Sequence, residues 1–157
     1  MEPASGTLIY LIKQLELGLR PVLEDAVSRE GLSAAQYTAL TVLRRRPGLT
    51  SSELARRSFV RAQTMAETIA FLMKRDLISR EVDPANGRRF LLYITADGNR
   101  VVEALRNPVS EVEALLLNGL DEDQRMVLIE TLRACRDSLG EAPRVRDRVA
   151  VGAGDDS

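Results

Sequence analysis

The chain has 157 residues, 45% of them hydrophobic, and its 22 basic and 23 acidic side chains leave a formal net charge of −1. This length fits one ordinary domain with a core of its own. With no histidine and a single cysteine, the chain cannot form Ser-His-Asp or Cys-His catalytic groups, His-ligated metal sites or an intramolecular disulfide. We also find no signal peptide and no run of about 18 apolar residues. We therefore predict a soluble cytoplasmic protein that is not an enzyme and needs no metal or cofactor.

The charge is unevenly distributed along the chain. Residues 44–89 carry 11 basic and 5 acidic side chains, a net charge of +6, whereas residues 1–43 have a net charge of −2 and residues 90–157 of −5. A basic middle third between acidic flanks favours contact with a polyanion, although a solvated charged surface would give the same numbers.

The N-terminal segment, residues 7–30, is predicted to form a helix because its apolar side chains recur every three or four positions. Pro21 lies inside it, so we expect a kink or a break near Arg20. Gly31 is the expected stop.

Two helix starts follow from capping-box sequences. Ser33 with Gln36 opens a helix that ends before a Pro-Gly pair, and Thr50 with Glu53 opens a short helix over about residues 51–57. Both boxes pair a hydroxyl with an amide or carboxyl side chain three residues later, which satisfies backbone N–H groups at the helix start.

A further helix is expected over residues 61–75, after which the apolar period changes from about 3.6 to 2. Ile78–Asp83 and Phe90–Ile94 are predicted strands. Pro84-Ala85-Asn86-Gly87 has the composition of a turn, so we predict a β-hairpin with four residues in its turn.

The C-terminal part is predicted to be helical. A long helix over residues 96–118 begins at the cap Thr95, and Pro108 predicts a kink or a restart within it. A last helix covers about residues 121–138. Residues 140–157 have no apolar periodicity, and we expect a disordered tail.

A short helix pair followed by a hairpin is typical of a winged helix-turn-helix. The second helix can lie in the major groove of DNA with Arg61, Gln63 and Thr64 at its first turn, where Gln suits adenine and Arg suits guanine. Exposed helix surface is the simpler interpretation of these three side chains.

From about residue 33 to residue 100, the sequence resembles the MarR family of transcriptional regulators. The match is most specific in DPANGRRFLLYITADG, residues 83–98, and the preceding stretch LTSSELARRSFVRAQTMAETIAFLMKRDLISRE supports it. The matching positions are Asp83, Asn86, Arg88, Ile94, Thr95 and Gly98. Gly87 and Asp76 depart from the family pattern, since an Arg and a Gly are usual there.

The resemblance implies a mainly α fold with a small β-hairpin wing, in one domain over residues 1–139. Residues 33–95 would form the winged DNA-binding lobe, and the helices of residues 7–30 and 96–139 would form a dimerisation region. The implied function is a dimeric, sequence-specific regulator of transcription that binds a pseudo-palindromic operator in double-stranded DNA. A repressor released by a small organic ligand is the form that we expect.

The resemblance also implies roles for residues of the wing. Arg88 matches the wing-tip arginine, which the family supports with an acidic residue two positions earlier. That position is Asn86 here, so a hydrogen bond would replace the ion pair, and Asp83 can substitute. Arg89 is a weaker candidate because its side chain should point to the opposite face of the strand.

Three further expectations concern residues outside the wing. Ser51 and Ser52 begin a helix, where hydroxyl and N–H groups suit a phosphate, although the cap needs neither. Tyr10 and Tyr37 can line a ligand crevice between the dimerisation region and the lobe, or they can simply be packed. Cys135 is expected to be a buried packing residue.

Two other classes of protein compete with this interpretation. An enzyme with a helical fold is disfavoured because the chain has no histidine and no clustered nucleophile and carboxylate. The alternative of a helical protein-interaction module without DNA binding stays open, although the wing arginine and the basic middle third favour DNA.

Overall fold

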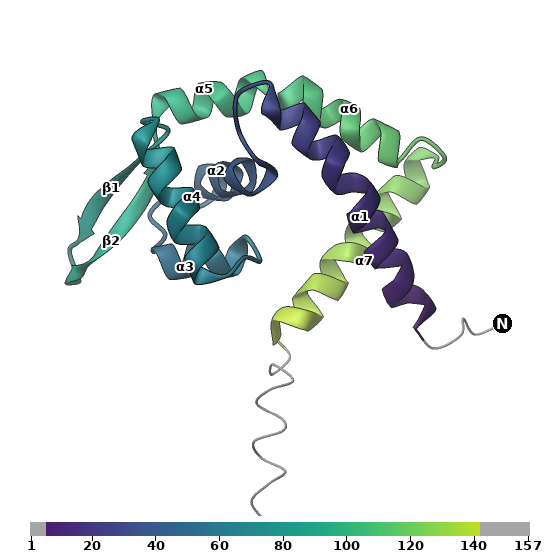
Figure 1. The fold of residues 1–157 in the computed structure, drawn as a ribbon. Coiled ribbons are helices and arrows are strands. Elements are labelled where there is room, and N and C mark those ends of the chain that lie inside the picture. The colour runs from purple at the N-terminus through teal and green to yellow at the C-terminus, as the bar shows by residue number, and fades with distance from the viewer. Residues whose placement is uncertain (1–5, 142–157) are drawn as a thin grey trace, which may run out of the picture. The chain divides into compact units, whose positions relative to one another are not determined.

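The computed structural model describes residues 6–141, which fall into two compact units that divide after Leu116. The first unit contains α1 (Thr7–Ser28), α2 (Ala34–Arg45), α3 (Ser51–Arg57), α4 (Ala62–Lys74), β1 (Ile78–Asp83), β2 (Asn86–Ile94), α5 (Ala96–Ala104) and α6 (Arg106–Leu116). The second contains α7 (Glu122–Glu141). The predicted class, mainly α with one β-hairpin, is confirmed (Figure 1). The expected tail lies outside the described residues from position 142 onward.

Both predicted capping boxes are present and fix the starts of α2 and α3. The Ser33 hydroxyl accepts from the Gln36 N–H at 3.2 Å, and the Gln36 side chain accepts from the Ser33 N–H at 2.9 Å. Thr50 and Glu53 repeat the arrangement at 3.3 and 2.9 Å. Because these bonds are local in sequence, the sequence pattern predicts both helix starts correctly.

The two helix-interior prolines behave differently. α1 is continuous through Pro21, so of the expected kink or break the break is wrong. Pro21 deprives only the Leu17 carbonyl of its partner, and Leu17 is exposed, so water can satisfy that carbonyl. Pro108 does mark a restart, because α5 ends at Ala104, the residue whose carbonyl would have bonded to the N–H that proline lacks.

The hairpin turn is tighter than predicted. β1 and β2 pair in antiparallel register from Ile78 opposite Ile94 to Val82 opposite Phe90, and Asp83 then pairs with Asn86. The turn is therefore two residues long, residues 84–85, and β2 begins at Asn86 instead of Phe90, with residues 87–89 forming a bulge. Side-chain hydrogen bonds explain the shorter turn. The Asp83 carboxylate accepts the Ala85 N–H, and the Asn86 side-chain oxygen accepts the Arg88 N–H.

The core of the first unit surrounds α2, which packs against α1, α3, α4, α5 and β2. Its largest fully buried side chains are Leu40, Leu43, Leu54, Met65, Leu72, Leu105, Val27 and Val101. On α4, Met73 is half-buried and Thr68 is buried. The hairpin base is joined to the lobe by backbone bonds of Leu92 with Gly48 and Leu49.

Gly98 allows α5 to pack closely on the start of the hairpin. A Cβ at this position would lie 2.2 Å from the Leu77 carbonyl oxygen and 2.6 Å from Ile94 Cγ1. We expect Gly98→Ala to lower the free energy of unfolding by about 3 kcal/mol, measured by chemical denaturation at fixed protein concentration. Gly87→Ala is the matched control, because nothing lies within 4 Å of its Cβ. Equal stability of the two variants would contradict this packing.

Candidate nucleic-acid interface

The first turn of α4 presents three polar side chains. Arg61 is the N-cap residue, and Arg61, Gln63 and Thr64 are all exposed. None of the three makes a side-chain hydrogen bond to another residue in the described part of the chain. Their donors and acceptors are therefore available to a partner, whereas Met65 and Thr68 hold the opposite face of α4 against the core.

The wing holds its two arginines in different ways. Arg89 Nη2 donates to Asp83 Oδ2 at 2.9 Å, and the other oxygen of this carboxylate accepts the Ala85 N–H at 2.9 Å. Asp83 is only 7% exposed, so both bonds compensate for the burial of its charge. The Asn86 side chain bonds the backbone N–H of Arg88, at 3.1 Å, and leaves the guanidinium of Arg88 exposed. The expected acidic support therefore reaches Arg89 instead of Arg88.

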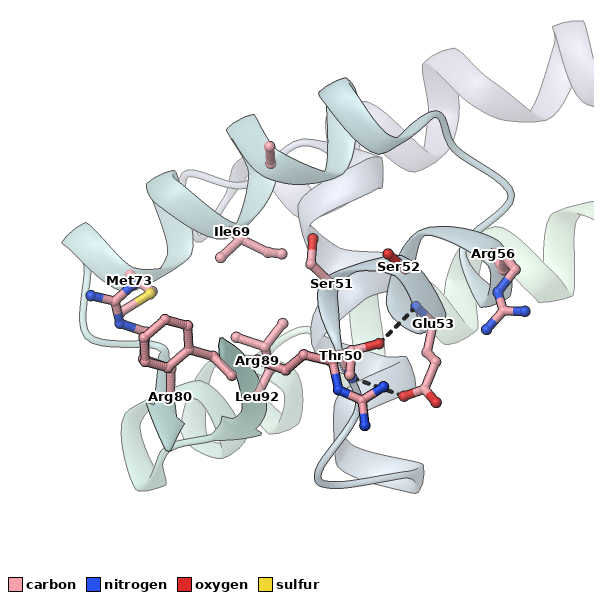
Figure 2. Close-up of a pocket in the computed structure, with 12 residues that line it drawn as sticks. Thr50, Ser51, Ser52, Glu53, Arg56, Ile69, Met73, Arg80, Arg89 and Leu92 are labelled. Carbon is pink, nitrogen blue, oxygen red and sulfur yellow. Dashed lines mark hydrogen bonds between the residues drawn. The ribbon is translucent and has the colours of Figure 1, made fainter. Parts of the chain in front are cut away.

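A cavity of about 500 Å³ lies between the wing, α3 and α4 (Figure 2). Hydroxyl groups and guanidinium groups gather on its polar side, over an apolar floor. Its lining residues are Thr50, Ser51, Ser52, Glu53, Arg56, Ala66, Ile69, Met73, Arg80, Arg89, Phe90 and Leu92. The structure thus brings Arg89 of the wing into one cavity with Ser51 and Ser52 at the start of α3.

Two arginines of this cavity were not singled out from the sequence. They are Arg56 on α3 and Arg80 on β1. The Arg80 guanidinium lies 4.4 Å from the centre of the Phe90 ring, a cation–π contact that spans the two strands. The register of the hairpin creates this contact, and it depends on the bulge that the sequence pattern did not reveal.

Among the described residues, Glu53 is the one carboxylate that lines the cavity, and it accepts a hydrogen bond from the Thr50 backbone N–H. The hydrogen bond from the Thr50 backbone lowers the pKa of Glu53 below its ordinary value, and the charges of Arg56 and Arg89 lower it further. The stabilisation by this cap is therefore present above the unfolded pKa and is lost as the pH falls through the lowered folded pKa. At neutral pH the three arginines outnumber it, and the cavity has a net positive charge.

A second cavity, of about 630 Å³, lies beside α2, α5 and α6. Its lining residues are Tyr37, Thr41, Arg44, Arg45, Val102, Glu103, Arg106, Val109, Ser110 and Glu113. Burial raises the pKa of the Tyr37 hydroxyl, and the nearby Glu113 charge adds to the effect. Arg44 pairs with Glu103, and this hydrogen bond lowers the pKa of Glu103. Tyr10 is 64% exposed and does not line this cavity, so the structure does not bring the two tyrosines together.

Large apolar side chains outside the lobe are exposed on α1, α6 and α7. They are Leu8, Ile9, Tyr10, Leu11, Ile12, Leu15, Leu17 and Val22 of α1, Leu115 and Leu116 of α6, and Met126, Val127, Ile129, Leu132 and Leu139 of α7. We call these residues the uncovered apolar surface. α1 and α6 also border a groove of about 200 Å³.

Cys135 is exposed, so the expectation of a buried packing cysteine is wrong. α7 buries none of its described side chains, although its start is held by hydrogen bonds, in which the side chains of Asp121 and Gln124 accept each other's backbone N–H groups. The sequence pattern identifies the apolar face of this helix but does not reveal what covers it. Within residues 6–141, no helix is both long and apolar enough to cross a membrane.

A short helix pair, an exposed first turn on its second helix and a hairpin that shares a basic cavity with the pair define a winged helix-turn-helix protein. The MarR family model matches residues 30–89. The HTH-type transcriptional regulator ML2140 of Mycobacterium leprae is 30% identical over 112 residues, which cover 71% of this chain and 78% of that protein. The HTH-type transcriptional repressor Rv2887 of Mycobacterium tuberculosis is 29% identical over 116 residues, covering 74% and 84%.

A solved structure extends the similarity over the whole fold. The PcaV transcriptional regulator of Streptomyces coelicolor, in complex with its natural ligand, is 27% identical and superposes with a TM-score of 0.73, covering 88% of this chain and 99% of that one. The chain belongs to the MarR family of transcriptional regulators, and these relatives are regulators, not enzymes.

Proposed function

We propose that this regulator is a homodimeric repressor that binds a specific operator and is released from it by a small organic ligand. The observation that carries the DNA-binding part is the exposed first turn of α4 beside a cavity lined by Arg56, Arg80 and Arg89. Base-reading groups and phosphate-binding groups then face one duplex from the same side of the lobe.

In this proposal each part of the lobe has a different task on DNA. The first turn of α4 enters the major groove, where Gln63 can pair with adenine and Arg61 with guanine. Ser51, Ser52 and the anchored Arg89 hold the phosphates that border this groove. The free guanidinium of Arg88, at the wing tip, reaches the flanking backbone or a narrow minor groove, where negative potential attracts arginine.

The uncovered apolar surface supports the homodimer. Large apolar side chains in such numbers are rarely left exposed on the helices of a monomer, and a second copy of the chain would cover them. We therefore assign residues 7–30 and 96–139 to dimerisation and residues 33–95 to DNA binding, within one domain of residues 1–139. A two-fold dimer would read half-sites about 34 Å apart, which is one turn of DNA.

Two observations support repression with release by a ligand. Rv2887 is named a transcriptional repressor, and PcaV was solved with its natural ligand. In this chain the cavity beside Tyr37 combines an aromatic ring and Val109 with three arginines that outnumber its two glutamates, a combination suited to a small aromatic carboxylate. A ligand that binds one spacing of the two lobes more tightly would shift the dimer away from the DNA-binding spacing.

The proposed function is tested with duplexes selected by the full chain from a random-sequence pool. We expect a pseudo-palindromic consensus and a footprint of two adjacent major grooves. Failure to enrich any sequence at low salt would contradict the proposal.

Arg106→Ala is expected to weaken release by benzoate, used as a probe of the cavity beside Tyr37. Loss of one charge-assisted hydrogen bond should raise the benzoate concentration for half-release by at least about tenfold. Fluorescence anisotropy of a labelled duplex gives this concentration. Arg100→Ala is the control, because Arg100 pairs with Asp97 and does not line the cavity. The same response in both variants would show that the ligand binds elsewhere.

A further inference from the structure

Three helices of the first unit end in the same hydrogen-bonded motif. The N–H of Gly31 bonds the Ser28 carbonyl and the next N–H bonds Val27, and the same two bonds occur around Phe59 after α3 and around Asp76 after α4. This is the Schellman motif, whose central residue must adopt a left-handed backbone. The φ angles are 71° for Gly31 and 55° for both Phe59 and Asp76.

Phe59 is the outlier among the three central residues. Glycine has no Cβ to clash in the left-handed region, and aspartate visits it with help from its short polar side chain. Phenylalanine has neither advantage. Burial does not offset the strain either, since Phe59 is 80% exposed, the highest fraction among the exposed large hydrophobic side chains within the described residues. Strained residues of this kind are retained mainly where they contact a partner.

The turn holds the Phe59 ring outward beside the DNA-reading end of α4. Ser58 is buried and Val60 is half-buried, so these two neighbours of Phe59 anchor the turn to the core. The Phe59 ring therefore stays on the outer side of the turn. Phe59 and Arg61 are two positions apart in the sequence, which limits the distance between their Cα atoms to about 7 Å. Arg57 and Arg61 flank it on the exposed surface.

We propose that Phe59 contacts the 5-methyl group of a thymine in the major groove, next to the bases read by the first turn of α4. The inference rests on the proposed operator binding and adds a specificity-determining residue to it. A ring without donors or acceptors can distinguish thymine from cytosine only by apolar contact, and phenylalanine is among the side chains that suit the thymine methyl. The turn fixes the backbone of Phe59 before binding, so only the rotamers of this side chain are ordered on contact.

The test combines protein variants with removal of a single methyl group from DNA. The probe is the tightest duplex that the full chain selects from a random pool, and each thymine is replaced in turn by uracil. For the unmodified chain we expect one thymine per half-site at which uracil lowers affinity by about fourfold, the value of one buried methyl group. Phe59→Gly should bind the thymine duplex at least about tenfold more weakly, as expected for loss of a buried aromatic side chain, and should show no further loss with uracil.

Two variants separate this contact from effects on folding. Phe59→Gly relieves the strain and should melt at the same or a higher temperature. Asp76→Gly makes the same backbone change in the other Schellman motif and should leave both the affinity and the uracil effect intact. Phe59→Leu keeps an apolar side chain and should restore part of the uracil effect.

The outcomes are distinguishable. If Phe59→Gly binds the thymine duplex like the unmodified chain, or keeps the full uracil effect, the inference is overturned while operator binding stands. A uniform loss on every duplex, selected or scrambled, would mean a sugar or backbone contact and also overturns it. If the unmodified chain selects no duplex, the proposed function fails and this inference fails with it.

Discussion

Leu15→Asp should convert the proposed dimer into monomers and weaken operator binding by about a hundredfold or more. Leu15 lies on α1, is exposed in the single chain and borders the groove between α1 and α6. A carboxylate on a face that a second copy covers would have to be buried without a partner. Monomers lose the linkage of two lobes on one operator, and such linkage raises affinity by about 10²–10⁴.

Sedimentation equilibrium and duplex anisotropy measure the two effects in the same preparation. Lys13→Asp is the matched control, because it places the same side chain on the same helix at a position that is already charged. It should remain dimeric and bind normally. A Leu15→Asp protein that stays dimeric would refute the assignment of this surface, and a monomer that binds the full operator undiminished would refute the need for two lobes.

Arg88→Ala and Gln63→Ala should weaken DNA binding in two different ways. Arg88 is expected to hold backbone, so its loss should weaken every duplex and make the salt slope shallower by about 1 for each protomer. Gln63 is expected to read a base, so its loss should change the preference at one base pair by about 1–3 kcal/mol.

Binding of each variant to the selected duplex, to its single-base changes and to a scrambled duplex separates the two roles. Arg29→Ala is the control, since Arg29 caps α1 and lies outside the basic middle third. If Arg88→Ala and Gln63→Ala lose affinity equally on all duplexes, Gln63 does not read sequence, and another residue of α4 must do so.

Local chemistry made much of the fold predictable. The boxes at Ser33 and Thr50 use side chains three residues apart, so their bonds depend on sequence alone. Pro108 interrupts the long C-terminal helix because it removes a donor wherever it lies in a helix. Pro21 shows the limit of such rules, since α1 continues through it although it removes the same donor, and Leu17 and Ala104, whose carbonyls lose a partner, are both exposed.

The candidate site was less predictable because its geometry depends on contacts between distant elements. The bulge in β2 decides that Asp83 supports Arg89 instead of Arg88, and it brings Arg80 over Phe90. Side-chain bonds of Asp83 and Asn86 accompany that bulge, whereas the composition of residues 84–87 suggested a four-residue turn. The exposure of Cys135 depends on what covers α7, which no sequence pattern specifies.

The proposed function depends on specific, largely electrostatic binding to duplex DNA. The most direct measurement is the affinity of the full chain for the selected duplex and for a scrambled duplex over a range of salt concentrations. With about 6–10 phosphate contacts per dimer, log K should fall with log salt with a slope of about −5 to −9. The selected duplex should bind at least about 10³-fold more tightly than the scrambled one. Equal binding to both duplexes, or a slope near zero, would contradict specific binding to an operator by this chain.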